Sequence, residues 1–191
     1  MASEQRQKLL EAAIDYVADN GITDLSLRSL AAELGTSHRM LIHHFGSKDA
    51  LWVAIIEEVE ARQRAALADW FPDPSQPLEE AMRAWWRHLS DPSLWPNERL
   101  FFEVYVQGLS GRGPAATLLD GIVDSWVTPI AKMAREAGYP RRDARAYARL
   151  NVAVARGLLL DLLATGDRKA VDAALDQFIA LAQLSFRSRQ S

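Results

Sequence analysis

The chain has 191 residues, enough for one or two domains with a buried core. Its 22 basic and 25 acidic residues give a formal net charge of −3, which excludes a histone-like protein that binds nucleic acid through overall positive charge. The absence of cysteine excludes disulfide scaffolds, thiol nucleophiles and cysteine-ligated metals, and it fits a reducing compartment.

The N-terminal residues carry no signal for export or lipid attachment. Residues 1–8 are polar and charged, without the apolar core of a signal peptide behind them, and Ala2 excludes N-myristoylation. The apolar runs 51–56 and 157–160 are too short to cross a bilayer. We therefore expect a cytoplasmic protein with no membrane partner.

Helical patterns begin at the N-terminus. Apolar residues with helical spacing at 10–17 predict a first helix, which Asn20-Gly21 ends. Ser26 is a natural N-cap for a short second helix that ends at Gly35. A third short helix is predicted over 37–45 and a long fourth one over 48–69.

The rest of the chain continues this helical character after a proline-rich linker at 70–77. Pro129 should kink the helix in which it lies. No alternating strand pattern is present, so we predict an all-α fold of about nine helices. The later predicted helices span 77–90, 97–110, 114–138, 141–165 and 168–187.

Residues 26–45 have the spacing of a helix-turn-helix. Ala31, Gly35 and Leu41 follow the pattern Ala-x3-Gly-x5-Leu, in which the small residue lets two helices approach, the glycine permits the turn and the leucine fills the shared core. Such a pair presents its second helix to the major groove of DNA. Helix pairs with this spacing also occur in proteins that do not bind DNA, so the spacing alone leaves both uses open.

A local positive charge accompanies this motif. Residues 1–50 carry a net charge of −2, but residues 37–48 contain two cations, three histidines and no carboxylate. Such a patch can accept phosphates, and the guanidinium group of Arg39 matches the O6 and N7 atoms of guanine. A metal site at His43 and His44 is disfavoured, because adjacent helical residues point about 100° apart and no acidic partner lies at helical spacing. We expect neither a metal nor a cofactor.

The turn and the third predicted helix carry a family motif. The segment Gly35-Thr-Ser-His-Arg-Met-Leu-Ile-His-His-Phe-Gly-Ser-Lys-Asp-Ala-Leu51 resembles the hallmark Gly-Val-Ser-x-x-x-Leu-Tyr-x-His-Phe-x-Ser-Lys-x-x-Leu of the tetracycline-repressor (TetR) family of bacterial transcription regulators. Residues 27–34 resemble the second helix of that family, so the motif covers about residues 8–53. The resemblance implies a three-helix helix-turn-helix head on a helical body that binds a ligand and dimerises. The matching positions are Gly35, Ser37, Leu41, His44, Phe45, Ser47, Lys48 and Leu51.

The resemblance also implies roles for individual residues of the head, which we assign to residues 1–47. Base edges would meet Arg28, His38, Arg39 and Met40, and the phosphate backbone would meet Ser26, Ser37, His43 and Lys48. Leu41, His44 and Phe45 would hold the recognition helix in place. Ile42 departs from the family, which usually has a tyrosine there that contacts phosphate or sugar. This change removes one polar anchor and offers a methyl contact to thymine instead.

Bulky aromatic residues of the later helices indicate a cavity for a small molecule. Pockets for flat, apolar ligands have such walls with few polar anchors, and the resembling family places its inducer pocket in this region. A filled core is the alternative, because aromatic residues at helical spacing are more often core than pocket. The candidate ligand-binding residues are Trp85, Trp86, Phe101, Phe102, Tyr105, Ile122, Trp126 and Asn151.

The last two predicted helices carry broad apolar stripes. One monomer buries one side of such a hairpin, and two hairpins paired across a twofold axis form a four-helix interface. The resembling family dimerises in this way, so residues 48–191 are predicted to sense a ligand and to form a homodimer. The candidate interface residues are Tyr147, Val154, Leu158, Leu162, Ala174, Leu175, Phe178, Leu181 and Ala182.

No catalytic motif accompanies these features. Residues 108–111 and 111–116 miss the spacing of a hydrolase elbow and of a dinucleotide-binding loop, so we expect no enzyme. The resemblance implies a dimeric regulator, most commonly a repressor, that leaves a pseudopalindromic double-stranded DNA operator when a small, largely apolar or aromatic ligand of unknown identity binds the body. The alternative is an all-α protein-interaction module that uses its helix-turn-helix only for packing and has no small-molecule sensor.

Overall fold

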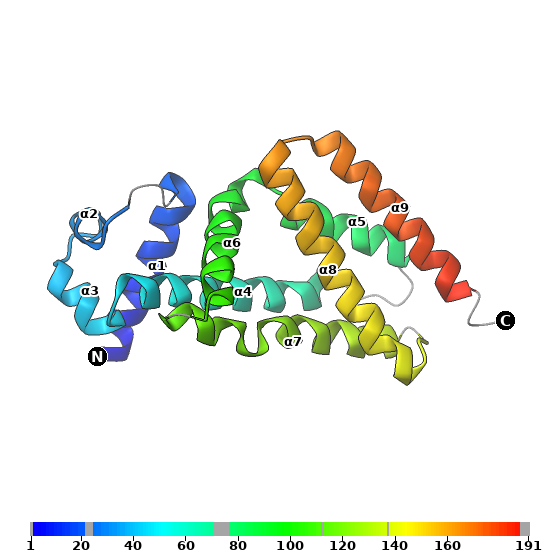
Figure 1. The fold of residues 1–191 in the computed structure, drawn as a ribbon, viewed down its shortest axis with the longest axis horizontal. Coiled ribbons are helices and arrows are strands. Elements are labelled where there is room, and N and C mark those ends of the chain that lie inside the picture. The colour runs from blue at the N-terminus through cyan, green and yellow to red at the C-terminus, as the bar shows by residue number, and fades with distance from the viewer. Residues whose placement is uncertain (1, 22–24, 71–76, 112, 137, 188–191) are drawn as a thin grey trace. The chain divides into compact units, whose positions relative to one another are not determined.

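The computed structural model describes residues 2–21, 25–70, 77–111, 113–136 and 138–187, and these residues form nine α-helices and no strand. The predicted all-α fold is therefore confirmed within these ranges (Figure 1). Residues 71–76 of the predicted linker lie outside them. The helices are α1 (Ala2–Asn20), α2 (Leu27–Glu33), α3 (His38–Phe45), α4 (Lys48–Trp70), α5 (Leu78–Leu89), α6 (Trp95–Leu109), α7 (Gly113–Glu136), α8 (Arg141–Thr165) and α9 (Arg168–Arg187), with a 3-10 turn η1 (Pro92–Leu94) before α6.

The first helix buries the apolar stripe that its sequence predicts. Leu10, Ala13, Ile14 and Val17 are each at most 5% exposed. Gly21 follows the helix with φ of +71°, and its N–H donates to the carbonyl of Val17 at 2.8 Å. Glycine adopts this left-handed conformation without steric cost, which explains the end of the helix at this point.

The described chain forms two compact units, each of which we describe by itself. The first unit comprises residues 1–65 and 92–120, and the second comprises residues 66–91 and 121–191. Within the first unit, α1 packs against α6, and α2 packs against α3. None of the helices in the described part of the chain combines the length and the apolar character that crossing a bilayer requires.

In the second unit, α8 packs against α9, and polar contacts connect α9 with the segment that contains α5. Because the partners lie about 80 to 100 residues apart in the sequence, these contacts fix tertiary structure rather than local helix geometry. The contacts are Trp86 Nε1 to Asp172 Oδ1 at 2.7 Å, Arg168 to Ser90 Oγ at 2.5 Å, an ion pair of Arg83 with Asp176, and a hydrogen bond from Gln183 to Glu79.

Helix α7 contains Pro129, as the sequence predicts, and also a left-handed residue that the sequence analysis did not foresee, Gly121 with φ of +83°. A side chain at this backbone geometry would be strained, so the position requires glycine. Gly121 is also the first residue of the second unit's later segment.

Candidate functional site

Helices α2 and α3 form the predicted helix-turn-helix, and serine caps define where each helix begins. Ser26 Oγ accepts from the Ser29 N–H at 3.1 Å, and Ser29 Oγ accepts from the Ser26 N–H at 3.0 Å, which makes a reciprocal capping box. Ser37 Oγ accepts from the Met40 N–H at 3.2 Å. Between the two helices, Gly35 has φ of +62°, a conformation that favours glycine at the turn.

The inner faces of this helix pair are buried. Leu30 is 0%, Ala31 2% and Leu41 1% exposed, and Phe45 is 8% exposed with the Arg6 guanidinium group 5.0 Å from its ring centroid. The small side chain of Ala31 and the buried side chain of Leu41 therefore lie in the core between the two helices, as their spacing predicts. This core holds α3 rigidly on α2, a precondition for a helix that enters a DNA groove.

All nine predicted DNA-binding residues are exposed. Met40 and Ile42 are the apolar members of this set, with 38% and 37% of their surfaces exposed. The Lys48 ammonium group lies 5.7 Å from the ring centroid of Trp52, whose side chain is buried in α4. We call the set Ser26, Arg28, Ser37, His38, Arg39, Met40, Ile42, His43 and Lys48 the α2–α3 face.

The two adjacent histidines have different environments. His43 is exposed, whereas His44 is half-buried with its ring 6.5 Å from that of Phe45. The Nε2 atom of His44 is buried and has no hydrogen-bond partner among the described residues. His44 therefore packs beneath the helix, as predicted. The described residues contain no group of three or more His, Asp or Glu residues that could hold a metal ion.

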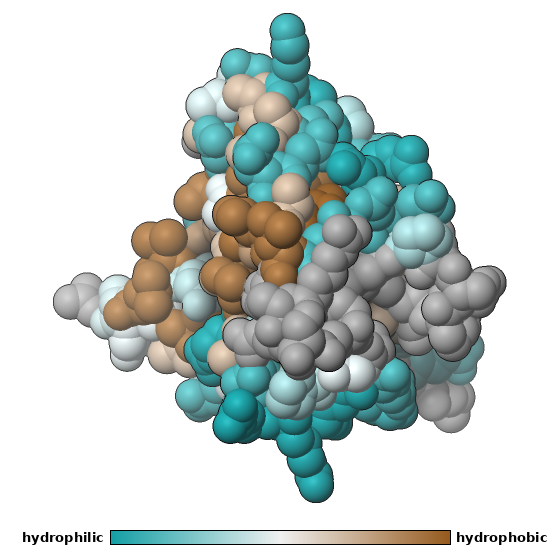
Figure 2. Space-filling model, turned by 90° about the vertical axis from the view of Figure 1, so that its right-hand side faces the viewer, coloured by the Kyte–Doolittle hydropathy of each residue, from teal (hydrophilic) through white to brown (hydrophobic). Residues whose placement is uncertain are grey.

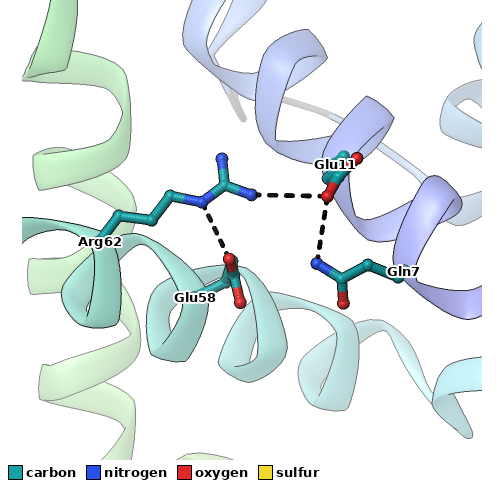
Figure 3. A network of polar contacts seen from close by, with 4 residues as sticks. All are labelled: Gln7, Glu11, Glu58 and Arg62. Atoms are coloured by element: carbon teal, nitrogen blue, oxygen red, sulfur yellow. Dashed lines mark hydrogen bonds and ion pairs between the residues drawn. The ribbon is translucent and has the colours of Figure 1, made fainter. Parts of the chain in front are cut away.

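A polar network connects the first helix with α4 (Figure 3). Arg62 Nε donates to Glu58 Oε1 at 2.9 Å, and its Nη2 lies 4.0 Å from Glu11 Oε1. Gln7 Nε2 donates to the same Glu11 oxygen at 3.3 Å. The side chains of Arg62 and Glu11 are about half exposed, so each pair contributes less than about 1 kcal/mol. The network therefore connects α1 with α4 but contributes little to the stability of the fold.

Five of the predicted ligand-binding residues lie in the second unit, where they are packed. Trp126 is 7% exposed, and its ring lies 6.0 Å from that of Trp85. Trp86 is 4% exposed and uses its indole N–H in the bond to Asp172, and Ile122 is 7% exposed. Asn151 Nδ2 donates to the carbonyl of Tyr147 at 2.8 Å. Trp85 and Trp126 share a core cluster with Leu67, Val123, Val127, Ile130, Ala131, Met133, Ala148 and Val152.

The other three predicted ligand-binding residues lie in the first unit. Phe101 is 5% exposed, and its ring lies 5.2 Å from Phe102 and 5.4 Å from Tyr105. Phe101 also lines a small cavity between α4 and α6. The sequence analysis missed the polar residues of this cavity, Glu60, Asn97 and Glu98. No periodic or motif signal marks them, since Asn97 and Glu98 follow Trp95-Pro96 in a first helical turn, where polar residues are ordinary.

The predicted dimer residues separate into an inner and an outer set. Leu162, Leu175 and Ala182 are 0%, 7% and 9% exposed, so they pack inside the monomer and offer no surface to a partner. Ala174 and Leu181 are exposed, and Tyr147, Val154, Leu158 and Phe178 are half-buried. Exposed leucines that the sequence analysis did not select lie on the same two helices, at Leu150, Leu160 and Leu184, with 53%, 50% and 63% exposure. Figure 2 shows apolar residues gathered in patches on one side of the molecule.

Tyr147 lies at the start of α8 against a second tyrosine. Its ring stacks on that of Tyr139 at 4.3 Å. Burial raises the pKa of the Tyr147 hydroxyl above 10.0, and hydrogen bonds with Asn151 and Tyr139 partly offset this effect. Tyr147 therefore has an internal role in the cluster of Ala134, Tyr139 and Ala144.

The fold and the α2–α3 face define a DNA-binding protein of the helix-turn-helix class with a helical body. Residues 9–55 match the family model described as bacterial regulatory proteins, tetR family. The chain is 27% identical over 154 residues to the transcriptional repressor NicS of Pseudomonas putida, a match that covers 74% of this chain and 68% of NicS.

Solved structures share the fold of this chain. A transcriptional regulator from Rhodococcus sp. Rha1 superposes with a TM-score of 0.73 at 21% identity, covering 92% of this chain and 94% of the other. A regulator from Saccharomonospora viridis in complex with choline has a TM-score of 0.67 at 22% identity, covering 93% and 96%. Residues 9–55 therefore carry a segment typical of the TetR family, and the chain is a DNA-binding transcription regulator.

Proposed function

We propose that this regulator is a homodimeric repressor that binds a pseudopalindromic operator and leaves it when a small, largely apolar or aromatic molecule binds the body. Residues 1–47 would bind DNA, residues 48–191 would bind the ligand and the second copy, and the protein would work in the cytoplasm. The observation that carries the proposal is that all nine residues of the α2–α3 face are exposed while Leu30, Ala31 and Leu41 beneath them are buried.

The residues of the α2–α3 face divide by chemistry. Arg39 projects from the first turn of α3 and can donate two hydrogen bonds to guanine, while Met40 and Ile42 can contact thymine methyl groups. Lys48 and His43 suit phosphates. Ser26 and Ser37 already cap their helices, so a phosphate would meet the exposed N-terminal turns of α2 and α3 together with these hydroxyl groups.

Dimerisation is supported by the exposed apolar residues of α8 and α9. Leu150, Leu160, Leu181 and Leu184 each expose half or more of their surface in the single chain. Exposing these four leucines to water costs roughly 25 cal/mol per Å² of apolar area. A second copy of the chain packed against them would remove this cost. A twofold interface also explains how two heads would reach half-sites about one helical turn of DNA apart.

Ligand sensing is supported by a solved structure that shares the fold and contains a bound small molecule. The S. viridis regulator, which shares the fold, holds choline. In this chain the aromatic residues of the second unit form a buried cluster, so a ligand there would need side chains to move. Binding would release DNA only through a difference in affinity between the DNA-bound and the free conformation.

The test selects operator sequences from a random pool of duplex DNA with the full chain. The expected result is enrichment of a pseudopalindrome, bound by two copies of the protein, with affinity that falls steeply as salt rises. Leu181→Glu should yield monomers that bind the same DNA much more weakly. Enrichment of no sequence, or binding that is independent of salt, would refute the proposal.

A further inference from the structure

The exposed side of α8 carries a continuous apolar stripe. Its members recur at intervals of four, three, four, three and four residues, which is the heptad spacing of a seam between two packed helices. None of them is polar or charged, and Leu150 and Leu160 expose 53% and 50% of their surfaces. The residues on the other side of the helix, such as Ala148 and Val152, are buried within the chain. We call the stripe the α8 seam, and its members, all exposed, are Ala146, Leu150, Ala153, Gly157, Leu160 and Ala164.

Gly157 lies in the middle of the α8 seam, where the single chain does not require a glycine. Glycine is less stable than alanine inside a helix, because it loses more backbone entropy on folding. Gly108 is explained by the carbonyl oxygen of Ala115, which a Cβ would approach to 2.5 Å, and Gly121 by its φ of +83°. Gly157 has no left-handed backbone, and a Cβ added there would meet no other described part of the chain within 4 Å. The close approach of another helix accounts for the missing side chain.

The order of side chains in the α8 seam is symmetric about Ala155. Counted outward from Ala155, the seam has a small residue two positions away, a leucine five positions away and an alanine nine positions away in both directions. In an antiparallel pair of identical helices with a twofold axis at this level, each residue meets the one that lies equally far on the other side of the axis. Small residues would then pack together at the centre, and leucines would pack together on both sides of them. A partner of different sequence requires no such symmetry, so the order favours a second copy of the chain.

Helix α9 carries a second exposed stripe with its centre at the same level. Helix α9 begins two residues after Gly166, follows Asp167 and packs against α8, so the two helices lie side by side and antiparallel (Figure 1). Ala155 and Gln177 each lie eleven residues from Gly166, so one twofold axis can pass both centres. Gln177 would meet its own copy there, and its amide group both donates and accepts hydrogen bonds. On either side of it, alanines would meet leucines of the other copy. The members of this α9 seam, all exposed, are Ala170, Ala174, Gln177, Leu181 and Leu184.

Both seams are needed for an interface of the usual size. At a rise of 1.5 Å per residue and a helix width of about 10 Å, the α8 seam covers roughly 270 Å² per copy and the α9 seam roughly 210 Å². Together they give about 1,000 Å² over two copies, which is the area that a biological interface needs, whereas the α8 seam alone gives about half of it. A parallel pair of α8 helices would place the two α9 helices on opposite sides and leave their seams uncovered. An antiparallel pair covers both.

We propose that a second copy of the chain packs on the α8 and α9 seams about a twofold axis at the level of Ala155 and Gln177. Ala153 lies against Gly157 of the partner subunit at the centre, where the missing side chain lets the two α8 helices approach closely. This inference rests on the proposed function, because it specifies the geometry of the proposed homodimer. None of the α8 residues that the sequence analysis selected for the interface belongs to the α8 seam.

The first experiment tests the register by disulfide cross-linking in the full chain. The chain has no cysteine, so introduced cysteines report contacts between copies without background. Chains with Leu150→Cys and chains with Leu160→Cys, carrying tags of different length, are expressed together and oxidised. We expect a disulfide between the two variants, because these positions face each other across the proposed axis.

A matched mixture and the self-linked products provide the controls. Leu150→Cys with Ala146→Cys pairs two exposed positions of the same seam that would lie about 21 Å apart along the helix axis, so no mixed disulfide should form. Two copies of Leu150→Cys would lie about 15 Å apart and should not link either. Self-linked Leu150→Cys would show a parallel pair and would overturn the inference. Absence of the link between Leu150→Cys and Leu160→Cys chains, or equal linking in both mixtures, would overturn it as well.

The second experiment measures the dissociation constant of the dimer by sedimentation equilibrium. Gly157→Leu fills the space at the centre of the interface, so the dissociation constant should rise at least tenfold. Ala61→Leu adds a leucine at an exposed position of α4 and should leave it unchanged. An unchanged dissociation constant in Gly157→Leu would overturn the inference. If this variant loses its helical circular dichroism, the cross-linking experiment decides.

Operator binding, measured on the unaltered chain, distinguishes this inference from the proposed function. A dimer that binds a pseudopalindromic operator without the predicted cross-link would overturn the register and leave the proposed regulator intact. A cross-linked dimer that selects no DNA sequence would support the interface and refute the proposed function. A chain that stays monomeric would overturn the inference, whether or not it binds DNA.

Discussion

Arg39→Ala provides the sharpest test of the α2–α3 face. Arg39 is exposed on α3 and makes no ion pair among the described residues, so its removal should change the free energy of unfolding by less than about 0.5 kcal/mol. A bidentate contact to guanine contributes about 1–3 kcal/mol of discrimination per head, or a factor of roughly 5 to 150. Two heads on one operator would lose about 2–6 kcal/mol.

The assay is fluorescence anisotropy of the selected operator and of a scrambled duplex at several salt concentrations. A base contact predicts that Arg39→Ala loses affinity for the operator but little for the scrambled duplex, with a nearly unchanged salt dependence. A phosphate contact predicts an equal loss on both duplexes and a slope of log affinity against log salt that is shallower by about 0.9 per head. Arg142→Ala, which removes the same charge from an exposed position of α8, is the control. Unchanged affinity for both duplexes would refute the reasoning.

Three further predictions concern packing and ionisation. Leu41→Ala should lower the free energy of unfolding by about 2–5 kcal/mol in urea titrations, because Leu41 is 1% exposed; a loss below about 1 kcal/mol would contradict its burial. Gly108→Ala should destabilise by about 1–3 kcal/mol in the same assay, since its Cβ would lie 2.5 Å from the Ala115 carbonyl oxygen; a gain would show that α6 and α7 separate freely. The pKa of Tyr147 is raised above 10.0, so its neutral hydroxyl contributes to the free energy of unfolding below pH 10.0, and this contribution is lost as the pH rises further. Tyr147→Phe should therefore reduce the loss of stability at alkaline pH. An identical loss in the variant and the unaltered protein would contradict this prediction.

The helix-turn-helix was predictable because its determinants are local. Ser26 and Ser37 cap helices within three residues of themselves, and Gly35 supplies the turn between them. The identity of the buried residues Leu41 and Phe45 follows from their spacing of four. Short-range signals of this kind do not depend on the rest of the chain.

The dimer face was only partly predictable, because periodicity identifies an apolar stripe but not what covers it. Leu175 and Leu181 both belong to apolar positions of α9, yet the first is 7% and the second 64% exposed. The difference arises because other elements of the same chain cover one side of the helix. Choosing between the two sides requires tertiary contacts, which a single sequence does not display.

The acidic cavity was unpredictable for a related reason. Glu60 lies on α4 at a charged stretch that resembles a solvated helix face, and Glu98 lies in the first turn of α6, where acidic residues are favoured for electrostatic reasons alone. Only the approach of two helices separated by more than thirty residues buries both side chains.

The packing of α1 against α6 has a consequence for exchanging specificities between regulators. A chimera joined at residue 47 would transplant the reading helices but leave α1 facing a foreign α6, with Glu11 opposite a foreign residue at the position of Arg62. The compact unit that contains the helix-turn-helix also includes residues 92–120, far along the chain. Grafting only the exposed residues of α2 and α3 onto another member's scaffold would preserve that interface. DNA recognition should therefore be transferred to another regulator by substituting individual side chains rather than by exchanging a contiguous segment of the chain.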